Sequence, residues 1–188
     1  SMNEELQFIY DSAKEHMDRT IAHFEKALAK IRAGRANPSM LADVRVEYYG
    51  NHVPLSQVSN VSTPDARTIT IQPWERNLIS IIEKEILNAG LGFNPSNNGD
   101  VVIINVPPLT EERRKDLVKM ARAEAEDSRI GIRAARKEAH DEQKRLDQSH
   151  ISEDVMKDHE AEIQELTNKY IRDIDAYLDK KEAEIMTV

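Results

Sequence analysis

Apolar residues recur at every third or fourth position along two long segments at the ends of the chain. In residues 3–33 this stripe consists of Leu6, Ile9, Ala13, Met17, Ile21, Phe24, Leu28 and Ile31. From Ser152 onward it consists of Val155, His159, Ile163, Leu166, Tyr170, Ile174, Tyr177 and Ile185. This spacing predicts two amphipathic helices. Gly34 is placed to end the first helix, and Ser152 to cap the start of the last.

A third long segment, residues 110–148, begins after Pro107-Pro108 and contains no further proline. Small side chains mark its inner positions, namely Ala121, Ala125, Ser128, Ala135 and Ala139. Small residues allow helix axes to approach closely. Three one-sided helices of similar length bury their stripes best against one another, so we expect an elongated three-helix bundle.

The segment between the first two long helices has a different pattern, rich in proline and glycine. Residues 44–49 and 52–58 are strand candidates on either side of a Gly50-Asn51 turn, and residues 67–72 and 101–106 are two more. Residues 75–89 have apolar positions at helical spacing. We predict a small sheet packed by one helix, with Tyr48, Tyr49 and Trp74 in its core or in cross-strand packing rather than in a ligand site. Pro73-Trp74 ends a strand, so the ring of Trp74 could also be exposed.

The predicted fold is therefore α+β, with a small β/α/β domain (35–108) inserted into a helical bundle (1–34 and 109–188). Two connections join the domains, at Gly34-Arg35 and at Pro107-Pro108. Two connections at one place form a hinge, which can bend but limits free tumbling.

Composition narrows the function classes. The 188 residues carry a formal net charge of −8 and include no cysteine, which excludes a disulfide framework and a thiolate nucleophile. No apolar run approaches the length that a membrane-spanning helix needs, and no secretion signal is visible, so we expect a cytoplasmic protein. Motifs of nucleotide-binding loops and of hydrolase nucleophiles are absent, and the six histidines show no metal-binding spacing. We therefore expect neither an enzyme nor a bound metal or cofactor.

The middle helix carries a regular row of basic side chains. Residues 110–148 contain 11 basic and 10 acidic residues, whereas residues 149–188 contain 5 and 11. The basic row follows one helix face and is interrupted only by Glu126; its members are Lys115, Lys119, Arg122, Arg129, Arg133, Arg136 and Lys144. Such a row is typical of proteins that bind a phosphate backbone.

Two interpretations of this row stay open on the residues alone. The row could face structured RNA, or it could be a solvated face paired with the acidic last helix. A different class of function is a coiled-coil adaptor that pairs its helices with a protein partner.

Several motifs resemble the bacterial ribosome recycling factor family along essentially the whole chain. They include residues 31–38 (IRAGRANP), 46–50 (VEYYG), 72–74 (QPW) and 107–115 (PPLTEERRK), in order and at family spacing. The resemblance implies an L-shaped, two-domain, non-enzymatic translation factor. Such a factor binds the large ribosomal subunit after termination and splits the ribosome with elongation factor G and GTP hydrolysis.

The resemblance also implies roles for individual residues. Arg133 and Arg136 would contact ribosomal RNA, together with Arg32 near the hinge, and Arg129, Arg122 and Lys119 extend that face. Gly34, Arg35, Pro107 and Pro108 would form the hinge. The expected partners are large-subunit RNA and elongation factor G, bound by a monomer.

Overall fold

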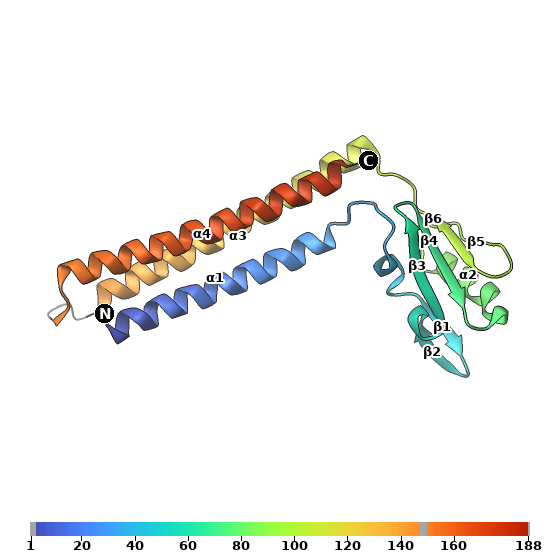
Figure 1. Ribbon diagram of the computed structural model, residues 1–188, viewed down its shortest axis with the longest axis horizontal. Coiled ribbons are helices and arrows are strands. Elements are labelled where there is room, and N and C mark those ends of the chain that lie inside the picture. Colours follow the sequence, from blue (N-terminus) through green and yellow to red (C-terminus); the bar gives the residue numbers. More distant parts are fainter. Residues whose placement is uncertain (1–2, 147–149, 188) are drawn as a thin grey trace. The chain divides into compact units, whose positions relative to one another are not determined.

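The computed structural model describes residues 3–146 and 150–187. These residues form two compact units, one containing the chain up to Ala33 together with Glu111–Thr187, and the other spanning Gly34–Thr110. The fold is α+β with two domains, as the sequence predicted. Figure 1 shows the long helices of the first unit and the strands of the second.

The first unit consists of three long helices, α1 (Glu4–Lys30), α3 (Glu111–Arg145) and α4 (Glu153–Met186). In Figure 1 they lie side by side along their lengths. Two contacts along each pair fix their directions. His16 and Thr20 of α1 lie beside Glu138 and Gly131 of α3. Gln143 and Arg129 of α3 lie beside Glu160 and Asp175 of α4. Because α3 is antiparallel to both neighbours, each of its flanks borders a different helix.

The helix ends follow local chemistry. Asn3 caps α1 by accepting a hydrogen bond from the Glu5 amide at 2.7 Å, and Ser152 caps α4 by accepting from the Val155 amide at 3.2 Å. The expectation that Gly34 ends the first helix is wrong, because α1 already ends at Lys30 and the backbone at Ile31 is extended. Gly34 instead adopts a left-handed φ of +77° beyond the helix.

The predicted stripes form the interior of the bundle. All the small residues predicted for the inner face of α3 are buried, and so are Met17 and Phe24 of α1. At the end where α1 begins, the core consists of Leu6, Ile9, Ala13, Ala139, Met156 and Ile163. In α4 the expected positions Val155 and Tyr177 are only partly covered, and Met156 and Leu178 are buried instead.

The second unit contains two sheets where one was predicted. A two-stranded hairpin pairs β1 (Arg45–Tyr48) with β2 (Asn51–Pro54), and a four-stranded antiparallel sheet has the order β3-β4-β6-β5. Its strands are β3 (Ser59–Asp65), β4 (Thr68–Pro73), β5 (Ser96–Asn97) and β6 (Val102–Asn105). The predicted helix begins with a short 3₁₀ turn at Arg76–Leu78 and continues as α2 (Ile79–Asn88), whose Ile82 and Ile86 are buried in the core.

The hairpin turn differs from the prediction by one residue. Tyr48 pairs with Asn51, so the two turn residues are Tyr49 and Gly50, with φ of +49° and +83°. Positive φ at both positions is the turn geometry that matches strand twist, and glycine adopts it without strain. The return strand ends at Pro54, and a 3₁₀ turn at Leu55–Gln57 separates it from β3, a strand that the polar sequence did not reveal.

Two of the three aromatic side chains predicted to pack in the core or across strands are exposed, and one of them is Trp74, whose position at the end of a strand allowed exposure. Tyr49 is 81% exposed because it lies in the hairpin turn, and Trp74 is 68% exposed because it follows the last residue of β4. Tyr48 does pack against the core, and a hydrogen bond to Glu75 raises the pKa of its hydroxyl.

Candidate nucleic-acid interface

The predicted basic row lies on the flank of α3 that borders α4. The buried face of α3 carries Leu117, Ala121, Ala125, Ile132 and Ala135. At 100° per residue, the basic positions lie between about 65° (Arg136) and about 165° (Lys119) from the centre of this face. Arg122, Arg129 and Arg136 lie on the side of α4. The basic side chains are exposed apart from Arg129, which is 20% exposed. The helix therefore presents its cations along one continuous edge.

Two of these arginines are bound to carboxylates of α4. Arg122 Nε donates to Glu182 Oε1 at 2.5 Å, and Arg129 donates from Nε and Nη2 to Asp175 Oδ1 at 3.0 and 2.7 Å. Hydrogen bonds to Glu182 and Asp175 raise the pKa of the two guanidinium groups above their usual value. For Arg122 and Arg129, the interpretation of a row paired with the acidic helix therefore describes the structure.

Arg133 and Arg136 are in a different position. Arg133 is 54% exposed, and its ion pair with Glu126 is long, at 3.8 Å. The side chains of Arg136 and Lys119 are exposed and form no ion pair or hydrogen bond with any other part of the described chain. Since Arg133 and Arg136 are about one turn apart, two guanidinium groups point outward from one stretch of α3.

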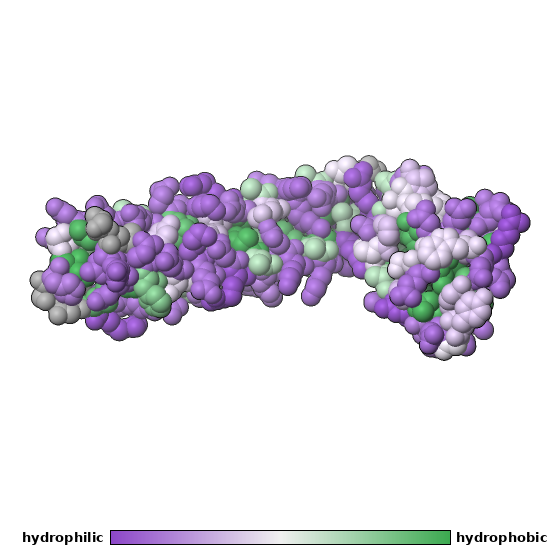
Figure 2. Space-filling model, turned by 60° about the horizontal axis from the view of Figure 1, so that its bottom comes forward, coloured by the Kyte–Doolittle hydropathy of each residue, from purple (hydrophilic) through white to green (hydrophobic). Residues whose placement is uncertain are grey.

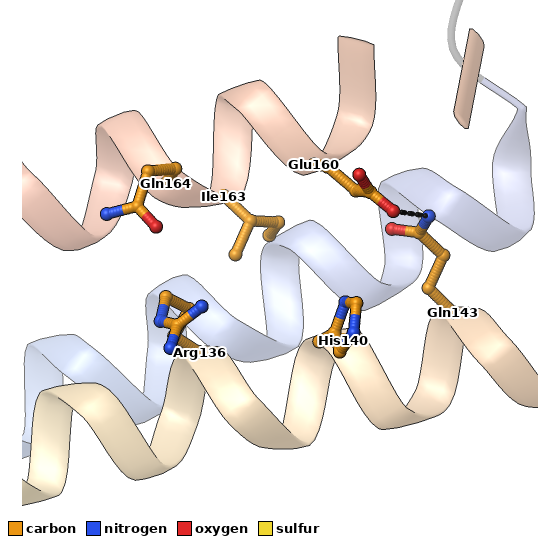
Figure 3. A pocket seen from close by; sticks show the side chains of 6 residues that line it. All are labelled: Arg136, His140, Gln143, Glu160, Ile163 and Gln164. Carbon is orange, nitrogen blue, oxygen red and sulfur yellow. Dashed lines mark hydrogen bonds between the residues drawn. The ribbon is translucent and has the colours of Figure 1, made fainter. Parts of the chain in front are cut away.

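A hollow of about 200 Å³ opens between α3 and α4 beside Arg136. It is lined by Arg136, His140 and Gln143 of α3 and by Glu160, Ile163 and Gln164 of α4. Figure 3 shows Arg136 and His140 next to each other on α3, with Gln164 and Ile163 across from them. At one end Gln143 donates to Glu160 at 3.2 Å, which leaves Arg136 as the cation at the other end. The basic edge is therefore concave where its cations are least paired.

Arg32 lies just beyond the end of α1 and is exposed. It belongs to the same unit as the basic edge, because that unit includes the chain up to Ala33. Arg32 has an interaction with another group of the chain, so it differs from Arg136.

Among the predicted hinge residues, Gly34 is packed closely against Leu109. A Cβ atom on Gly34 would lie 2.5 Å from Leu109 Cγ, and the φ of +77° is itself unfavourable for other residues. Arg35, Pro107 and Pro108 are exposed. The Ala36 amide donates to the Ala66 carbonyl at 2.8 Å, and the Val106 amide donates to the Arg67 carbonyl at 2.7 Å. Both connections are therefore attached to the same turn between β3 and β4.

One structural arginine was not singled out by sequence reasoning. Arg114 is buried near the start of α3, and its Nη1 donates to the carbonyls of Ile185 and Thr187 at 2.8 and 3.0 Å. It thereby satisfies carbonyl groups at the end of α4 that have no partner within the helix. Arg114 lies outside the spacing of the basic row. This position was the only feature of the sequence that distinguished it from the exposed arginines.

Membrane spans and metal sites are both missing from residues 3–146 and 150–187. Within these ranges, none of the helices combines the length and the apolar character that crossing a bilayer requires. The same residues contain no group of three or more His, Asp or Glu side chains arranged to hold a metal ion.

Fold and site together define a class: a two-domain α+β protein whose helical bundle carries an exposed basic edge. Residues 24–186 match the family model described as "Ribosome recycling factor". The chain is 58% identical over its whole length to the ribosome-recycling factor of Flavobacterium johnsoniae, covering 100% of both chains. It is 60% identical to that of Christiangramia forsetii over 98% of this chain and 100% of that one, and 48% identical to that of Thermus thermophilus over 96% and 98%.

Two solved structures of ribosome recycling factors are similar to this chain over nearly its whole length. A solution structure of a ribosome recycling factor covers 100% of both chains with a TM-score of 0.73 and 37% identity. A second structure has a TM-score of 0.60 and 48% identity, and covers 97% of this chain and 99% of that one. It represents the Thermus thermophilus factor and Escherichia coli elongation factor G bound to the Escherichia coli post-termination complex. The chain belongs to the ribosome recycling factor family.

Proposed function

We propose that this chain binds the post-termination ribosome and, with elongation factor G and GTP hydrolysis, separates it into subunits in the cytoplasm. The observation that carries the proposal is identity of 58–60% along the whole chain to ribosome-recycling factors. The related Thermus factor, represented on a post-termination complex with elongation factor G, supports the choice of partners. The role is mechanical, and the chain itself hydrolyses nothing.

The bundle is the part that we assign to large-subunit RNA. Arg133 and Arg136 are the principal contacts because they are exposed and weakly paired. Planar guanidinium groups suit phosphate oxygens, which they can bind with two hydrogen bonds. Lys119 and Arg32 extend the interface, whereas Arg122 and Arg129 first have to leave Glu182 and Asp175.

The smaller unit is the part that we expect to move. Gly34, Arg35, Pro107 and Pro108 form the two connections about which it turns when the GTPase acts. A monomer suffices for this cycle. The adaptor hypothesis is less well supported, because the apolar stripes that it needs are filled within the bundle.

The test is sedimentation of post-termination ribosomes with this protein, elongation factor G from the same source, and GTP. We expect subunits only in the complete mixture. A non-hydrolysable GTP analogue and the omission of each factor serve as controls. Intact ribosomes in the complete mixture, despite co-sedimentation of the protein, would contradict the proposed activity but leave binding in place.

A further inference from the structure

The other flank of α3, which borders α1, carries a groove with the opposite charge. Two adjoining hollows of about 370 and 380 Å³ lie along it, and both are lined by Phe8, Ile9 and Glu142. They form one groove near the end of the bundle where α1 begins. Figure 2, which brings the α1 side forward, shows apolar surface in green between the polar side chains at this end.

The groove has an apolar floor and an apolar wall. Its floor is formed by Ile9 and Ala13 of α1 and Ala139 of α3, which are buried core residues that border the surface. Phe8 stands beside them and is 71% exposed, the most exposed of the chain's phenylalanine side chains among the described residues. A ring held in water next to an apolar floor gains free energy when another apolar side chain covers it.

Carboxylates surround the apolar surface. Glu4 and Glu5 lie at one end, Glu15 along α1, and Glu138 and Glu142 along α3. The cations are fewer: Arg19 is paired with Glu15 at 3.1 Å, and the His16 ring lies 3.8 Å from Glu138. The groove therefore carries an excess of negative charge, whereas the opposite flank of α3 is basic.

This combination selects one kind of occupant. An RNA backbone is repelled by the carboxylates. A small molecule needs an enclosed site, and these hollows are open to solvent. A protein segment with an aliphatic or aromatic side chain flanked by lysine or arginine matches both the apolar floor and the acidic rim.

We propose that this acidic groove between α1 and α3 binds a basic segment of a partner protein, anchored by an apolar side chain against Phe8. The proposal does not depend on ribosome binding. It assigns α3 two functional flanks, a basic one for RNA and an acidic one for a polypeptide.

The test uses the full chain and a short, fluorescein-labelled amphipathic peptide of lysine and leucine, with fluorescence anisotropy as the readout. A matched peptide with serine in place of leucine keeps the charge and removes the anchor. We expect saturable binding of the leucine peptide, and binding weakened on the order of tenfold by Phe8→Ala. Glu138→Gln with Glu142→Gln should weaken binding and flatten its dependence on salt.

Matched variants elsewhere on the bundle serve as controls. Ile130→Ala removes another exposed apolar side chain of α3, and Glu165→Gln with Asp179→Asn removes two exposed carboxylates of α4. Neither should change binding. The proposal is wrong if the serine peptide binds as well as the leucine peptide, if Phe8→Ala and Ile130→Ala behave alike, or if no saturable binding occurs. Saturable binding of a labelled RNA hairpin to the parent protein that is weakened by Phe8→Ala would assign the groove to RNA and overturn the proposal.

Discussion

At the scale of single residues, what matters about each cation of α3 is which carboxylate lies near it. Arg129 donates two hydrogen bonds to one oxygen of Asp175. Arg136, about two turns further along the same helix, has no such partner in the described chain. A paired guanidinium must give up its carboxylate before it can bind phosphate, and an unpaired one need not. The residues of one row are therefore unequal as ligands for RNA.

The double substitution Arg133→Glu with Arg136→Glu tests the RNA assignment. Both side chains are exposed, so we expect the free energy of unfolding to change by about 0.5 kcal/mol or less. Ribosome binding should be abolished at moderate salt. For the single substitutions to glutamine, the slope of log affinity against log salt should fall by roughly 0.7–0.9 for each phosphate that is no longer bound.

The matched control is Arg172→Glu with Lys180→Glu, which makes the same change of charge at exposed positions of α4. It should leave the salt slope unchanged. If both double variants bind ribosomes as the parent does, the basic edge of α3 is a solvated face and RNA binds elsewhere on the bundle.

His159 gives a second residue-scale prediction, on pH. It is buried, its Nδ1 lies 2.7 Å from Gln143 Oε1, and its Nε2 has no hydrogen-bond partner in the described chain. Burial lowers the pKa of His159, although the Leu6 backbone and the carboxylates of Glu162 and Glu160 act in the opposite direction. The unfolded chain therefore takes up a proton first, near pH 6.5.

Because the unfolded state binds the proton more tightly, the bundle should lose stability as the pH falls below about 6.5, by at most about 1.4 kcal/mol per pH unit for one histidine. Thermal unfolding between pH 7.5 and 5.5 measures this. In His159→Gln, which keeps a polar side chain toward Gln143, the decline should be smaller. The decline in stability should persist in His23→Gln, because His23 is exposed. An equal decline in all three proteins would show that His159 is not responsible.

At the scale of elements, the sequence predicts best what periodicity controls. The three long helices and their buried small residues follow from spacing, because a one-sided stripe has few other ways to be buried. Strand β3 was not predicted because Ser59–Asp65 is mostly polar and buries only Ser59, so it shows no alternation of apolar positions. The two-residue strand β5 is too short to leave a pattern.

The basic row was predictable for the same reason as the helices, since positions three and four apart share a face. Its pairing with Glu182 and Asp175 was not. That pairing depends on how far α4 is shifted along α3, and such a shift is fixed by the packing of both helices, which spacing within one helix does not encode. The carboxylates opposite Arg122 and Arg129 could therefore not be named in advance.

Gly131 provides a prediction on helix packing. A Cβ atom there would lie 3.1 Å from Thr20 Cγ2 of α1, so α1 and α3 approach closely at this level. Gly131→Leu should destabilise the bundle by about 1–3 kcal/mol, because the added side chain must push Thr20 away. Urea unfolding measures the change.

Two companion variants separate packing from helix propensity. Ala134→Leu, at an exposed position of α3, should be nearly neutral. Thr20→Ala combined with Gly131→Leu should recover part of the stability, because the obstructing methyl group is gone. Additive effects of Thr20→Ala and Gly131→Leu would show that the two residues do not constrain each other.

At the scale of the whole molecule, we expect the two connections between the units to determine how the units move. Both are attached to the turn between β3 and β4, through the Ala66 and Arg67 carbonyls, and Gly34 packs against Leu109. Because both connections leave the small unit at the same turn, we expect them to bend together. We therefore expect that relative motion of the units needs no change inside either one.

A disulfide between one introduced cysteine in each unit should separate binding from splitting. The chain has no cysteine of its own, so the introduced pair is the only one that can form. We expect the oxidised protein to bind ribosomes with near-normal affinity and to split them poorly. Reduction of the same sample should restore splitting, which provides an internal control. Equal splitting in both states would remove inter-unit motion from the mechanism.

The insertion of one unit between α1 and α3 also dictates an order of events during synthesis. The strands and α2 are complete by Asn105, before any residue of α3 emerges, so that unit can fold while the bundle still lacks two helices. The apolar stripe of α1, made first, has to wait for α3, and it is fully covered only after α4, which ends at Met186, has been made. At about 5–20 residues per second this delay is on the order of ten seconds. During that time Met17 and Phe24 are available to chaperones, and the first helix to be made is among the last to be packed.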